Sequence, residues 1–331
     1  MLGHKKMNTE ISVIIPNWNG RLHLENCLNS LKDQDFPSYE VIVVDNGSMD
    51  GSVEFIQHHS LKTRVIAFNE NRGFARAVNE GIKQAKGRYI LLLNNDVEAD
   101  PQLLRHLHEA ITTSRDADFY ACRMMDFWRR GLIDGIGDGF PRKGKAFRIG
   151  HGAKYGPSFH GRRRVFGACA GAALYKKDLF KVVGLFDEDF FAYHEDADWN
   201  FRANLMGYRC FTIPEAVVYH VGSSTTGSLH NEFTIFYNIR NIINVIIKNM
   251  PAPLLCKHFP RIIWGQMEGF LRYCVAQGYW RAYFAGLLNA VTLAPKMLKK
   301  RAEIKGRRRI SNFQLERLFL ASESERKGQI R

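Results

Sequence analysis

The 331-residue sequence lacks the cysteine patterns of zinc sites and disulfide-rich folds. Its six cysteines form neither a CxxC pair nor a Cys/His zinc spacing, which indicates scattered free thiols in a reducing compartment. The first ten residues carry charges but no apolar core, so they do not resemble a secretory signal peptide. The longest mostly apolar window, residues 282–294, falls short of the ~20 residues that cross a bilayer. We therefore expect a cytoplasmic globular protein.

Motifs of two other protein classes are also missing. No G-x-G-x-x-G follows the first predicted strand, which counts against a dinucleotide oxidoreductase. No stacking-aromatic RNA motif or helix-turn-helix pattern is present. The balance of 47 basic to 33 acidic residues, net +14, nevertheless indicates an anionic partner such as a nucleotide, a phospholipid surface or a nucleic acid. A non-catalytic basic module that binds polyanions therefore stays open as an alternative.

Short β-rich runs alternate with amphipathic helical patterns along the first hundred residues. The runs cover residues 11–15, 40–44, 64–68 and 89–93. Such alternation predicts an α/β fold with a parallel sheet and right-handed crossovers. Functional residues of such sheets gather at the carboxyl ends of the strands. The polar residues that follow each run are therefore candidates for a site.

The fourth run ends in Asn94, Asn95 and Asp96, directly after five apolar or aromatic residues. A carboxylate at the tip of a buried strand is a hard oxygen ligand that suits Mg²⁺ or Mn²⁺, and such an ion bridges phosphate oxygens. The alternative is that these three polar residues only turn the chain into the helix after Pro101.

The second and third runs end in further candidate residues. Asp45 lies at the second strand tip, where a carboxylate can accept a hydrogen bond from a pyrimidine ring N–H; a simple capping turn is the alternative. Arg72 and Arg76 flank Gly73 at a helix start, a setting suited to phosphate, although two surface arginines are also ordinary.

A second acidic cluster lies at residues 186–202, where six carboxylates fall within 12 residues among aromatic side chains. Like charges in proximity raise one another's pKa, which suits a general base. If a helix begins near Glu195, Asp198 and Arg202 lie at i, i+4, so that a structural ion pair explains both. Asp196 has no such local explanation. His220, at a later strand end, can complete a metal site if it meets Asp96.

The segment between these clusters is strongly basic. Residues 141–164 contain eight Lys or Arg, five Gly and no acidic residue, which predicts a mobile, electropositive loop that is either a lid or a solvated insertion. Small residues then dominate at 165–175 and permit close backbone approach to a ligand or a neighbouring strand.

Taken in order, these stretches resemble the family 2 inverting glycosyltransferases of the GT-A fold, especially bacterial enzymes that add rhamnose or similar sugars. The resemblance covers about residues 10–250. It rests on an ordered set of motifs: Ile15-Pro16-Asn17-Trp18-Asn19, Val44-Asp45-Asn46-Gly47-Ser48, Asn71-Arg72-Gly73-Phe74-Ala75, Asn94-Asn95-Asp96, Phe186-Asp187-Glu188 and Glu195-Asp196-Ala197-Asp198.

The resemblance implies a role for each candidate. Asp45 would bind the nucleotide base, Asp96 and His220 the metal ion, and Asp196 would be the general base. Glu195, Asp198 and Arg202 would support it. The donor would contact Pro16, Asn17, Asp45, Arg72, Gly73, Arg76 and Asn94. The expected reaction moves a sugar, from dTDP-rhamnose or a UDP-sugar, to a hydroxyl of a lipid-linked or cell-surface glycan.

The sequence departs from the family pattern at its metal motif. Where the family often has Asp-x-Asp, this chain has Asn94-Asn95-Asp96, and the neutral Asn predicts weaker metal affinity or its loss. The Gln-x-x-Arg-Trp motif and membrane bundle of the processive synthases are also missing, so we expect single or limited sugar addition.

The pattern changes to helical from about residue 232, which predicts a catalytic domain at 1–230 and a helical, basic extension at 231–331. Eight Lys or Arg between residues 296 and 309 follow aromatic and aliphatic residues. This arrangement predicts peripheral attachment to the cytoplasmic face of an anionic membrane. The alternative is a helical hairpin that packs on the catalytic domain or on a second subunit.

Overall fold

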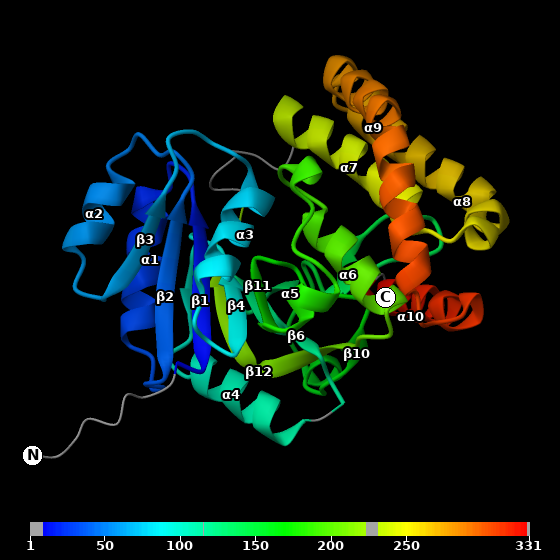
Figure 1. Cartoon of the computed structure of the whole chain (residues 1–331). Helices are drawn as coiled ribbons and strands as arrows, with labels where there is room; N and C mark the ends of the chain where they lie inside the picture. Colours follow the sequence, from blue (N-terminus) through cyan, green and yellow to red (C-terminus); the bar gives the residue numbers. More distant parts are fainter. Residues whose placement is uncertain (1–8, 115, 223–230, 330–331) are drawn as a thin grey trace, which may run out of the picture.

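The amino-terminal half of a central sheet contains four parallel strands in the computed structural model, which describes residues 9–114, 116–222 and 231–329 (Figure 1). Their order is β3-β2-β1-β4. The strands are β1 (Ile11–Asn17), β2 (Tyr39–Asp45), β3 (Thr63–Ala67) and β4 (Tyr89–Leu93), and the helices between them are α1 (Arg21–Lys32), α2 (Ser52–His58) and α3 (Phe74–Gln84). The α/β prediction is confirmed, and β4 has the predicted bounds.

The other half of the sheet, which lies beyond the four strands that the alternation predicts, is mixed. Strand β11 (Ala172–Lys176) runs antiparallel between β4 and β6 (Phe119–Asp126), and β12 (Cys210–His220) lies parallel to β6. Shorter strands extend it: β5 (Val97–Ala99), β7 (Ile133–Gly135) and β10 (Arg164–Val165). Strands β8 (Asp138–Gly139) and β9 (Phe147–Arg148) pair separately.

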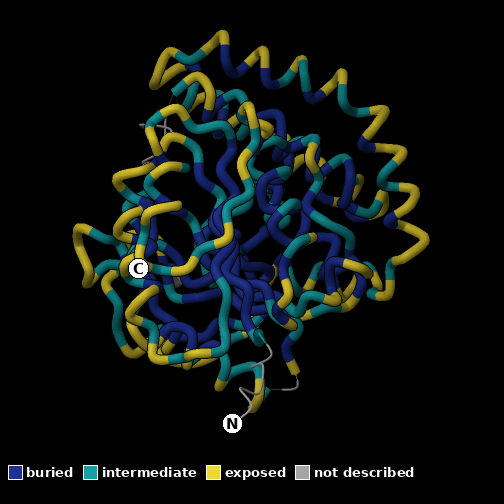
Figure 2. The backbone as a smooth tube through the Cα atoms, turned by 60° about the vertical axis from the view of Figure 1, so that its left-hand side comes forward, coloured by how far each residue is buried: buried dark blue, intermediate teal, exposed yellow. Residues whose placement is uncertain are grey.

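Helices cover both faces of the sheet and bury a core on each. In β4, Ile90 and Leu92 face one core and Leu91 and Leu93 the other, since successive side chains of a strand point to opposite faces. One core is covered by α3 and α6 (Glu195–Leu205), and the other by α1, α2 and α4 (Leu103–Thr113). Figure 2 shows these strands as the buried centre of the molecule. Burial on both faces explains the uninterrupted apolar run of β4.

Four helices follow at the carboxyl-terminal end: α7 (Glu232–Asn249), α8 (Ala252–Phe270), α9 (Trp280–Arg307) and α10 (Asn312–Gln329), with a π-helical turn, η3 (Leu271–Val275), after α8. They share a hydrophobic core with the sheet-containing part of the chain. In this core, Phe140, Phe166 and Phe201 pack against Phe319 of α10. The predicted boundary at 230/231 adjoins residues 223–230, which lie outside the described residues. No described helix is long and apolar enough to span a membrane.

The basic segment at 141–164 is anchored rather than free. Arg142 forms a bidentate ion pair with Glu323 of α10, and Lys143 lies 2.7 Å from Glu268 of α8. Short elements, including η1 (Pro157–Phe159) and β9, interrupt it. The segment thus connects the sheet-containing part of the chain to the C-terminal helices. Of the two alternatives, a lid and a solvated insertion, the solvated insertion is not what the structure contains.

Candidate active site

The carboxyl ends of β1, β2 and β4 meet in a chain of buried hydrogen bonds. Asn17 donates to Asp45 Oδ2 at 2.9 Å and accepts from Asn95 at 2.7 Å. The backbone N–H of Ser48 donates to the other oxygen of Asp45. Three predicted motifs are therefore joined side chain to side chain, with Asp45 fixed at the centre, and Asn17, Asp45 and Asn95 are almost fully buried. Pro16 precedes Asn17 and pairs with Val44 in the neighbouring strand.

The loop after β3 folds over this edge through Asn46. The Asn46 side chain donates to Asn71 and to the Gly73 carbonyl and accepts from the Arg72 N–H. The Arg72 guanidinium is exposed and lies 3.4 Å from Glu70. The Arg76 guanidinium is also at the surface, bonded to Glu188 at 2.7 Å. Of the two predicted phosphate ligands, Arg76 is therefore committed to a carboxylate of the second acidic cluster.

Asp96 and His220, 124 positions apart in the chain, come together as the sequence predicts. His220 Nε2 lies 3.4 Å from Asp96 Oδ1, and both side chains are about 5 to 6% exposed. The other ring nitrogen, Nδ1, lies 2.8 Å from Asp134 Oδ2, and Asp134 in turn is bonded by Arg148. The imidazole is thus held between two carboxylates.

Burial lowers the pKa of His220, but the bonds to Asp134 and Asp96 outweigh it and raise the pKa to about 9. Burial alone raises the pKa of Asp134, whereas bonds to His151 and His220 and the nearby Arg148 charge hold it well below its usual range. The arrangement therefore favours a positive charge between Asp96 and His220. A carboxylate and an imidazole whose other nitrogen meets a second carboxylate fit a divalent cation in place of the imidazole proton.

We call the Asp96 and His220 pair the first acidic station. The second acidic station, which contains Asp196, lies at the start of α6. Asp196 accepts from the backbone N–H of Ala170 at 3.2 Å and from its own neighbour Ala197 at 2.7 Å. Gly171 of the same small-residue segment reaches the strand end that carries Asp96, because its carbonyl accepts from the Asn94 N–H at 2.9 Å. Residues 169–171 therefore bridge the two acidic stations, and a Cβ at Gly171 would lie 3.1 Å from the Asn94 side chain.

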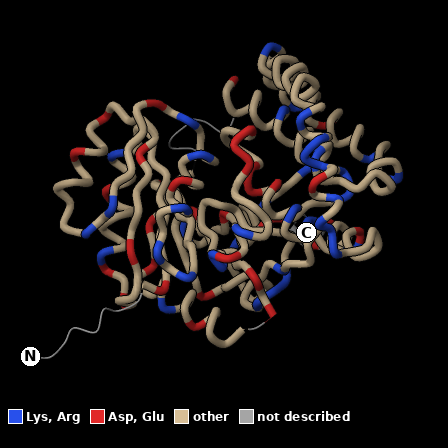
Figure 3. Tube along the Cα trace, viewed as in Figure 1, with Lys and Arg blue, Asp and Glu red and all other residues tan. Residues whose placement is uncertain are grey.

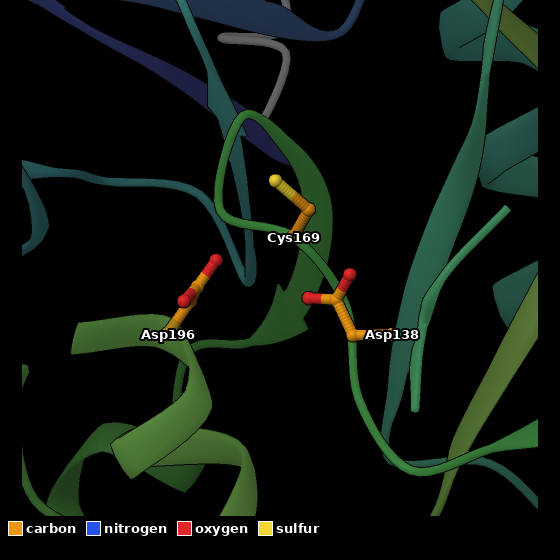
Figure 4. Close-up of side chains that lie close together, drawn as sticks. All are labelled: Asp138, Cys169 and Asp196. Carbon is orange, nitrogen blue, oxygen red and sulfur yellow. The ribbon is translucent and has the colours of Figure 1, made fainter. Parts of the chain in front are cut away.

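Asp196 shares its surroundings with Asp138 and Cys169. Ligand atoms of these three side chains lie within 4.8 Å of one another, and Figure 4 shows them converging from α6, β8 and the segment before β11. Burial and the Asp196 charge raise the pKa of Asp138. Burial also raises the pKa of the Cys169 thiol. Because their pKa values are raised, Asp138 and Cys169 tend to keep their protons, and a thiol is in any case a poor ligand for a hard cation. The Asp96 and His220 pair therefore fits a metal ion better.

Glu195 lies beside Asp196 and is 6% exposed. Burial first, and then the charge of Asp196, raise its pKa well above the usual range. Its Oε2 has no hydrogen-bond partner among the described residues. The predicted raising of carboxyl pKa values within residues 186–202 therefore holds for Glu195, with burial as its main cause. Although burial opposes the change, hydrogen bonds and nearby basic side chains instead lower the pKa values of Asp187, Glu188, Asp189 and Asp198.

The loop that delivers Asp196 has an unusual backbone. Phe191, Tyr193 and His194 all have positive φ, between 64 and 67°, a region that costs non-glycine residues of order 1–3 kcal/mol each. Asn241 of α7 holds this loop, donating to the carbonyl oxygens of Phe190, Ala192 and Tyr193 at 2.7 to 2.8 Å. Strain that the surrounding fold maintains is typical of residues that must be placed for function.

Asp198 and Arg202 form the structural ion pair that helical spacing predicts. Arg202 Nε lies 2.9 Å from Asp198, and its other nitrogens donate to the carbonyls of Val183 and Leu185. Lys248 and Asn249 of α7 also bond the buried Asp198. Both residues therefore fix α6 in place behind Asp196 rather than face a substrate.

Sequence reasoning missed Asp134, Asp138, Arg148 and Cys169. Each lies outside the recognised motifs, in short irregular strands or loops, and no local pattern indicates which of the molecule's carboxylates they will approach. For Asp134 and Asp138, the glycines in the run Ile133-Asp134-Gly135-Ile136-Gly137-Asp138-Gly139 are a sequence signal for close backbone packing.

Comparisons with known proteins identify the family and the fold of the chain. The family model described as Glycosyl transferase family 2 matches residues 12–184, slightly more than half of the chain. TuaG of Bacillus subtilis is 36% identical over 89 residues, which cover 26% of this chain and 35% of TuaG. The chain thus spans about a third of the length of that curated relative.

Two solved structures share the fold at low sequence identity. S. aureus TarS 1-349 in complex with UDP-GlcNAc superposes with a TM-score of 0.56 at 16% identity, covering 97% of this chain and 92% of TarS. The mannosyltransferase PcManGT from Pyrobaculum calidifontis, in complex with GDP-Man and Mn²⁺, gives 0.52 at 18% identity, covering 97% and 87%. Because the family model matches more than half of the chain, the chain belongs to glycosyl transferase family 2.

Proposed function

We propose that this glycosyltransferase inverts the configuration of the sugar that it transfers, with Asp196 as general base. The supporting observation is the convergence of two acidic stations, Asp96 with His220 and Asp196 with Asp138, on the short bridge at residues 169–171. Direct inversion needs a base opposite the leaving group, and separate stations can serve the two sides of the anomeric carbon.

Asp196 would take the proton of the acceptor hydroxyl. Its position at the positive end of α6 and its bond from the Ala170 N–H orient the carboxylate. Asp198, Arg202 and Glu195 support it from within the buried cluster. The strained loop at residues 191–194, held by Asn241, sets the direction from which α6 begins.

The donor nucleotide would bind at the edge formed by β1, β2 and β4. Asp45, which already accepts from Asn17 and Ser48, would also accept from a base N–H, and Pro16, Asn17, Gly73 and Asn94 would contact the donor with it. Arg72 is the exposed guanidinium available to the diphosphate, and Arg76 would act there only by leaving Glu188. These donor contacts remain predictions from the motifs and their geometry.

Asp96 and His220 would hold Mg²⁺ or Mn²⁺. A bound cation would neutralise the negative charge that develops on the nucleoside diphosphate as it leaves. Asn94 and Asn95 supply no charge, so the cation is held by fewer anionic ligands than in an Asp-x-Asp site.

The donor is proposed as dTDP-rhamnose or a UDP-sugar, and the acceptor as a hydroxyl of a lipid-linked or cell-surface glycan. The name of TuaG refers to teichuronic acid biosynthesis, and TarS was solved with UDP-GlcNAc. The UDP-GlcNAc complex supports a nucleotide-sugar donor, and the TuaG name supports a cell-envelope product. A lipid-linked acceptor would require the enzyme to work at the cytoplasmic face of the membrane.

Calorimetric titration of the purified protein with UDP, dTDP, GDP and NAD, each with and without Mn²⁺, tests the proposal. Metal-enhanced binding of UDP or dTDP is the expected result, because Asp45 and the metal pair recognise opposite ends of the nucleotide. Absence of binding in protein shown to be folded by circular dichroism would contradict it. Salt-sensitive binding of a polyanion in that case would indicate the non-catalytic basic module instead.

A further inference from the structure

The outward face of α8 and η3 is apolar and open to solvent. The side chains on it are between 46 and 65% exposed: Phe259, Ile263, Trp264, Met267, Leu271 and Val275. The residues that bury this helix against the protein lie on the opposite side: Leu254, His258, Ile262, Gly265 and Gly269. The helix therefore has two apolar faces, one covered by the fold and one uncovered among the described residues.

Helix α9 repeats this arrangement. Its exposed stripe is Trp280, Phe284, Leu288, Val291 and Leu298. Its buried side, Ala282, Tyr283, Gly286, Ala290 and Met297, packs on α7 and the shared core. The two stripes meet at the helical hairpin, where Phe270 contacts Trp280 at 5.5 Å and Trp280 stacks on Phe284 at 6.4 Å between centroids. In Figure 1 both helices lie at the outer edge, away from the sheet.

A basic groove adjoins the α8 stripe. It has a volume of about 710 Å³ and is lined by Pro141, Arg142, Lys143, Pro260, Arg261, Trp264, Glu323 and Arg326. A second hollow of about 340 Å³ is lined by Lys145, Ala146, Phe147, Glu268, Arg272 and Arg326. Trp264 belongs to both the groove and the stripe, and Arg326 to both hollows. The apolar face and the basic groove are therefore continuous.

Positive charge is in excess along this groove. The two hollows are lined by six Lys or Arg residues and two carboxylates, and both carboxylates are already used: Glu323 pairs with Arg142 and Glu268 with Lys143. Within the described ranges, Lys145, Arg261 and Arg272 have no ion pair. Burial lowers the pKa of Lys145; Glu268 opposes this, while Lys143, Arg272 and Arg326 add to it. An anion in the groove would relieve this repulsion.

We propose that the α8, η3 and α9 stripes insert into the interface of an anionic phospholipid bilayer, with lipid phosphates received by the basic groove. Helices that lie in a membrane interface combine an apolar face carrying Trp, Phe and Leu with Lys and Arg beside it, and Trp is enriched at that depth. Anionic headgroups complement the excess charge. The exposed apolar stripes and the groove charge are independent observations that point to the same partner.

The proposal moves the membrane contact away from the polybasic run at residues 296–309. Lys296 and Lys300 of that run bond Asp189 and Asp187 inside the protein, and Arg301 donates to the Ile247 carbonyl. Figure 3 shows many Lys and Arg positions on the side of the molecule formed by the carboxyl-terminal helices. The charges that contact lipid are those of the groove, together with Arg281, which flanks the α9 stripe.

The inference rests on the proposed function in one respect only, namely that a lipid-linked acceptor would require the enzyme to work at a membrane. Vesicle binding needs neither donor nor metal, so it is measured separately from transfer. Loss of vesicle binding with intact nucleotide binding would overturn the membrane surface alone, and the reverse result would overturn the transferase proposal alone.

The test is co-sedimentation of the full chain with phosphatidylcholine vesicles and with vesicles containing 30 mol% phosphatidylglycerol. This lipid content is on the order of a typical anionic leaflet. Wild-type protein is expected to bind the anionic vesicles at least tenfold more strongly. The double variant Trp264→Ser/Leu288→Ser should lose at least tenfold in affinity for them, and Arg261→Glu/Arg272→Glu should remove the preference for anionic lipid.

Matched controls separate the surface from general hydrophobicity and charge. Trp128→Ser removes an exposed tryptophan outside the helices, and Lys62→Glu reverses an exposed charge outside the groove; neither should change vesicle binding. Circular dichroism melts establish that each variant is folded. Equal vesicle binding of the stripe variants and wild type would overturn the proposal.

Two other outcomes would also overturn it. A dimer in sedimentation velocity that the Trp264→Ser/Leu288→Ser variant dissociates, without vesicle binding by wild type, would make the face a contact between copies of this chain. Calorimetric binding of inorganic phosphate without vesicle binding would reduce the groove to a site for a free anion.

Discussion

Lys300 of α9 donates to both carboxylate oxygens of Asp187, at 2.6 and 2.7 Å. Asp187 also bonds Lys248 of α7, and Lys300 reaches Asp189 as well. These contacts fasten the C-terminal helices to the turn that precedes the strained loop and Asp196. The helices are therefore part of the support of the site, even though no residue of α9 carries a predicted catalytic role.

Lys300→Met should lower the free energy of unfolding by about 1–3 kcal/mol, because it leaves two partly buried carboxylates with one fewer cation. Urea unfolding followed by circular dichroism measures this. Lys299→Met is the matched control, since Lys299 is exposed and has no ion pair within the part of the chain that the structure describes; it should stay within about 0.5 kcal/mol of wild type. Equal destabilisation by both variants would contradict the role of the network.

Stability should fall in acid through Asp187. Burial by itself raises the pKa of Asp187, but Lys248 and Lys300 outweigh it and hold the pKa well below its usual range. A group with a lowered folded-state pKa stabilises above its unfolded pKa, about 3.9 for Asp, and this contribution is lost as the pH falls below that value. Urea midpoints between pH 7 and pH 2.5 should therefore fall more steeply for wild type than for Asp187→Asn. Parallel curves would contradict the assignment.

Asp196→Asn should reduce turnover by about 10²–10⁴-fold and leave nucleotide binding unchanged, because the amide keeps the shape but cannot take the acceptor proton. Single-turnover transfer and calorimetry with UDP or dTDP separate the two effects. The control is Asp178→Asn, an exposed carboxylate paired only with Lys181, which should alter neither quantity. Retained turnover in Asp196→Asn would exclude this residue as the base.

Much of this site follows from sequence because its motifs end buried strands. A carboxylate after the apolar run of β4 has to lie at the sheet edge, where Asp45 also lies, and a strand-end His220 can be expected to meet Asp96. The i, i+4 spacing likewise identifies Asp198 and Arg202 as a local pair. In these cases regular structure fixes where a side chain goes.

The remaining contacts depend on tertiary packing, which the helical and strand periodicities of the sequence do not encode. Asp134 and Asp138 reach His220 and Asp196 from strands of three and two residues, whose path is set by the surrounding loops. The antiparallel β11 was equally hidden, because its uninterrupted apolar run is compatible with either direction. The polybasic run was identified correctly but its partners were not, since Asp187 and Asp189 lie more than 100 residues away.

The contact between His220 and Asp134 should tune the metal site. In metal-free protein, Asp134→Asn should lower the His220 pKa from about 9 toward 6.5, because one of the two carboxylates that stabilise the imidazolium is removed. NMR titration of the ring protons measures this.

Metal binding gives a second readout at the same pair. Asp96→Ala should abolish the Mn²⁺ enhancement of nucleotide binding, and Asp134→Asn should weaken it by about 10- to 100-fold, as loss of a carboxylate behind a ligating imidazole does. Nucleotide affinity that is the same with and without Mn²⁺ in wild type would remove the ligand role of Asp96. An unchanged His220 pKa in Asp134→Asn would contradict the contact itself.

Gly73 is a position where a single methyl group should disturb the loop that precedes Asp196. Its φ of 84° and ψ of 160° lie in a region that glycine alone adopts readily, and a Cβ there would lie 2.6 Å from the Phe191 carbonyl oxygen. That carbonyl accepts from the Ala75 N–H and belongs to the strained loop before Asp196. Gly73→Ala must therefore displace the loop as well as strain α3.

We expect Gly73→Ala to cost about 2–4 kcal/mol in the free energy of unfolding and to reduce kcat/KM for transfer at least tenfold. Gly152→Ala is the matched control, because Gly152 also has a positive φ, 77°, but a Cβ there meets nothing within 4 Å. It should cost only about 1–2 kcal/mol and leave transfer unaffected. Urea unfolding and initial-rate kinetics distinguish the two. If both variants lose the same stability and keep full activity, the contact between Gly73 and Phe191 does not position the loop of Asp196.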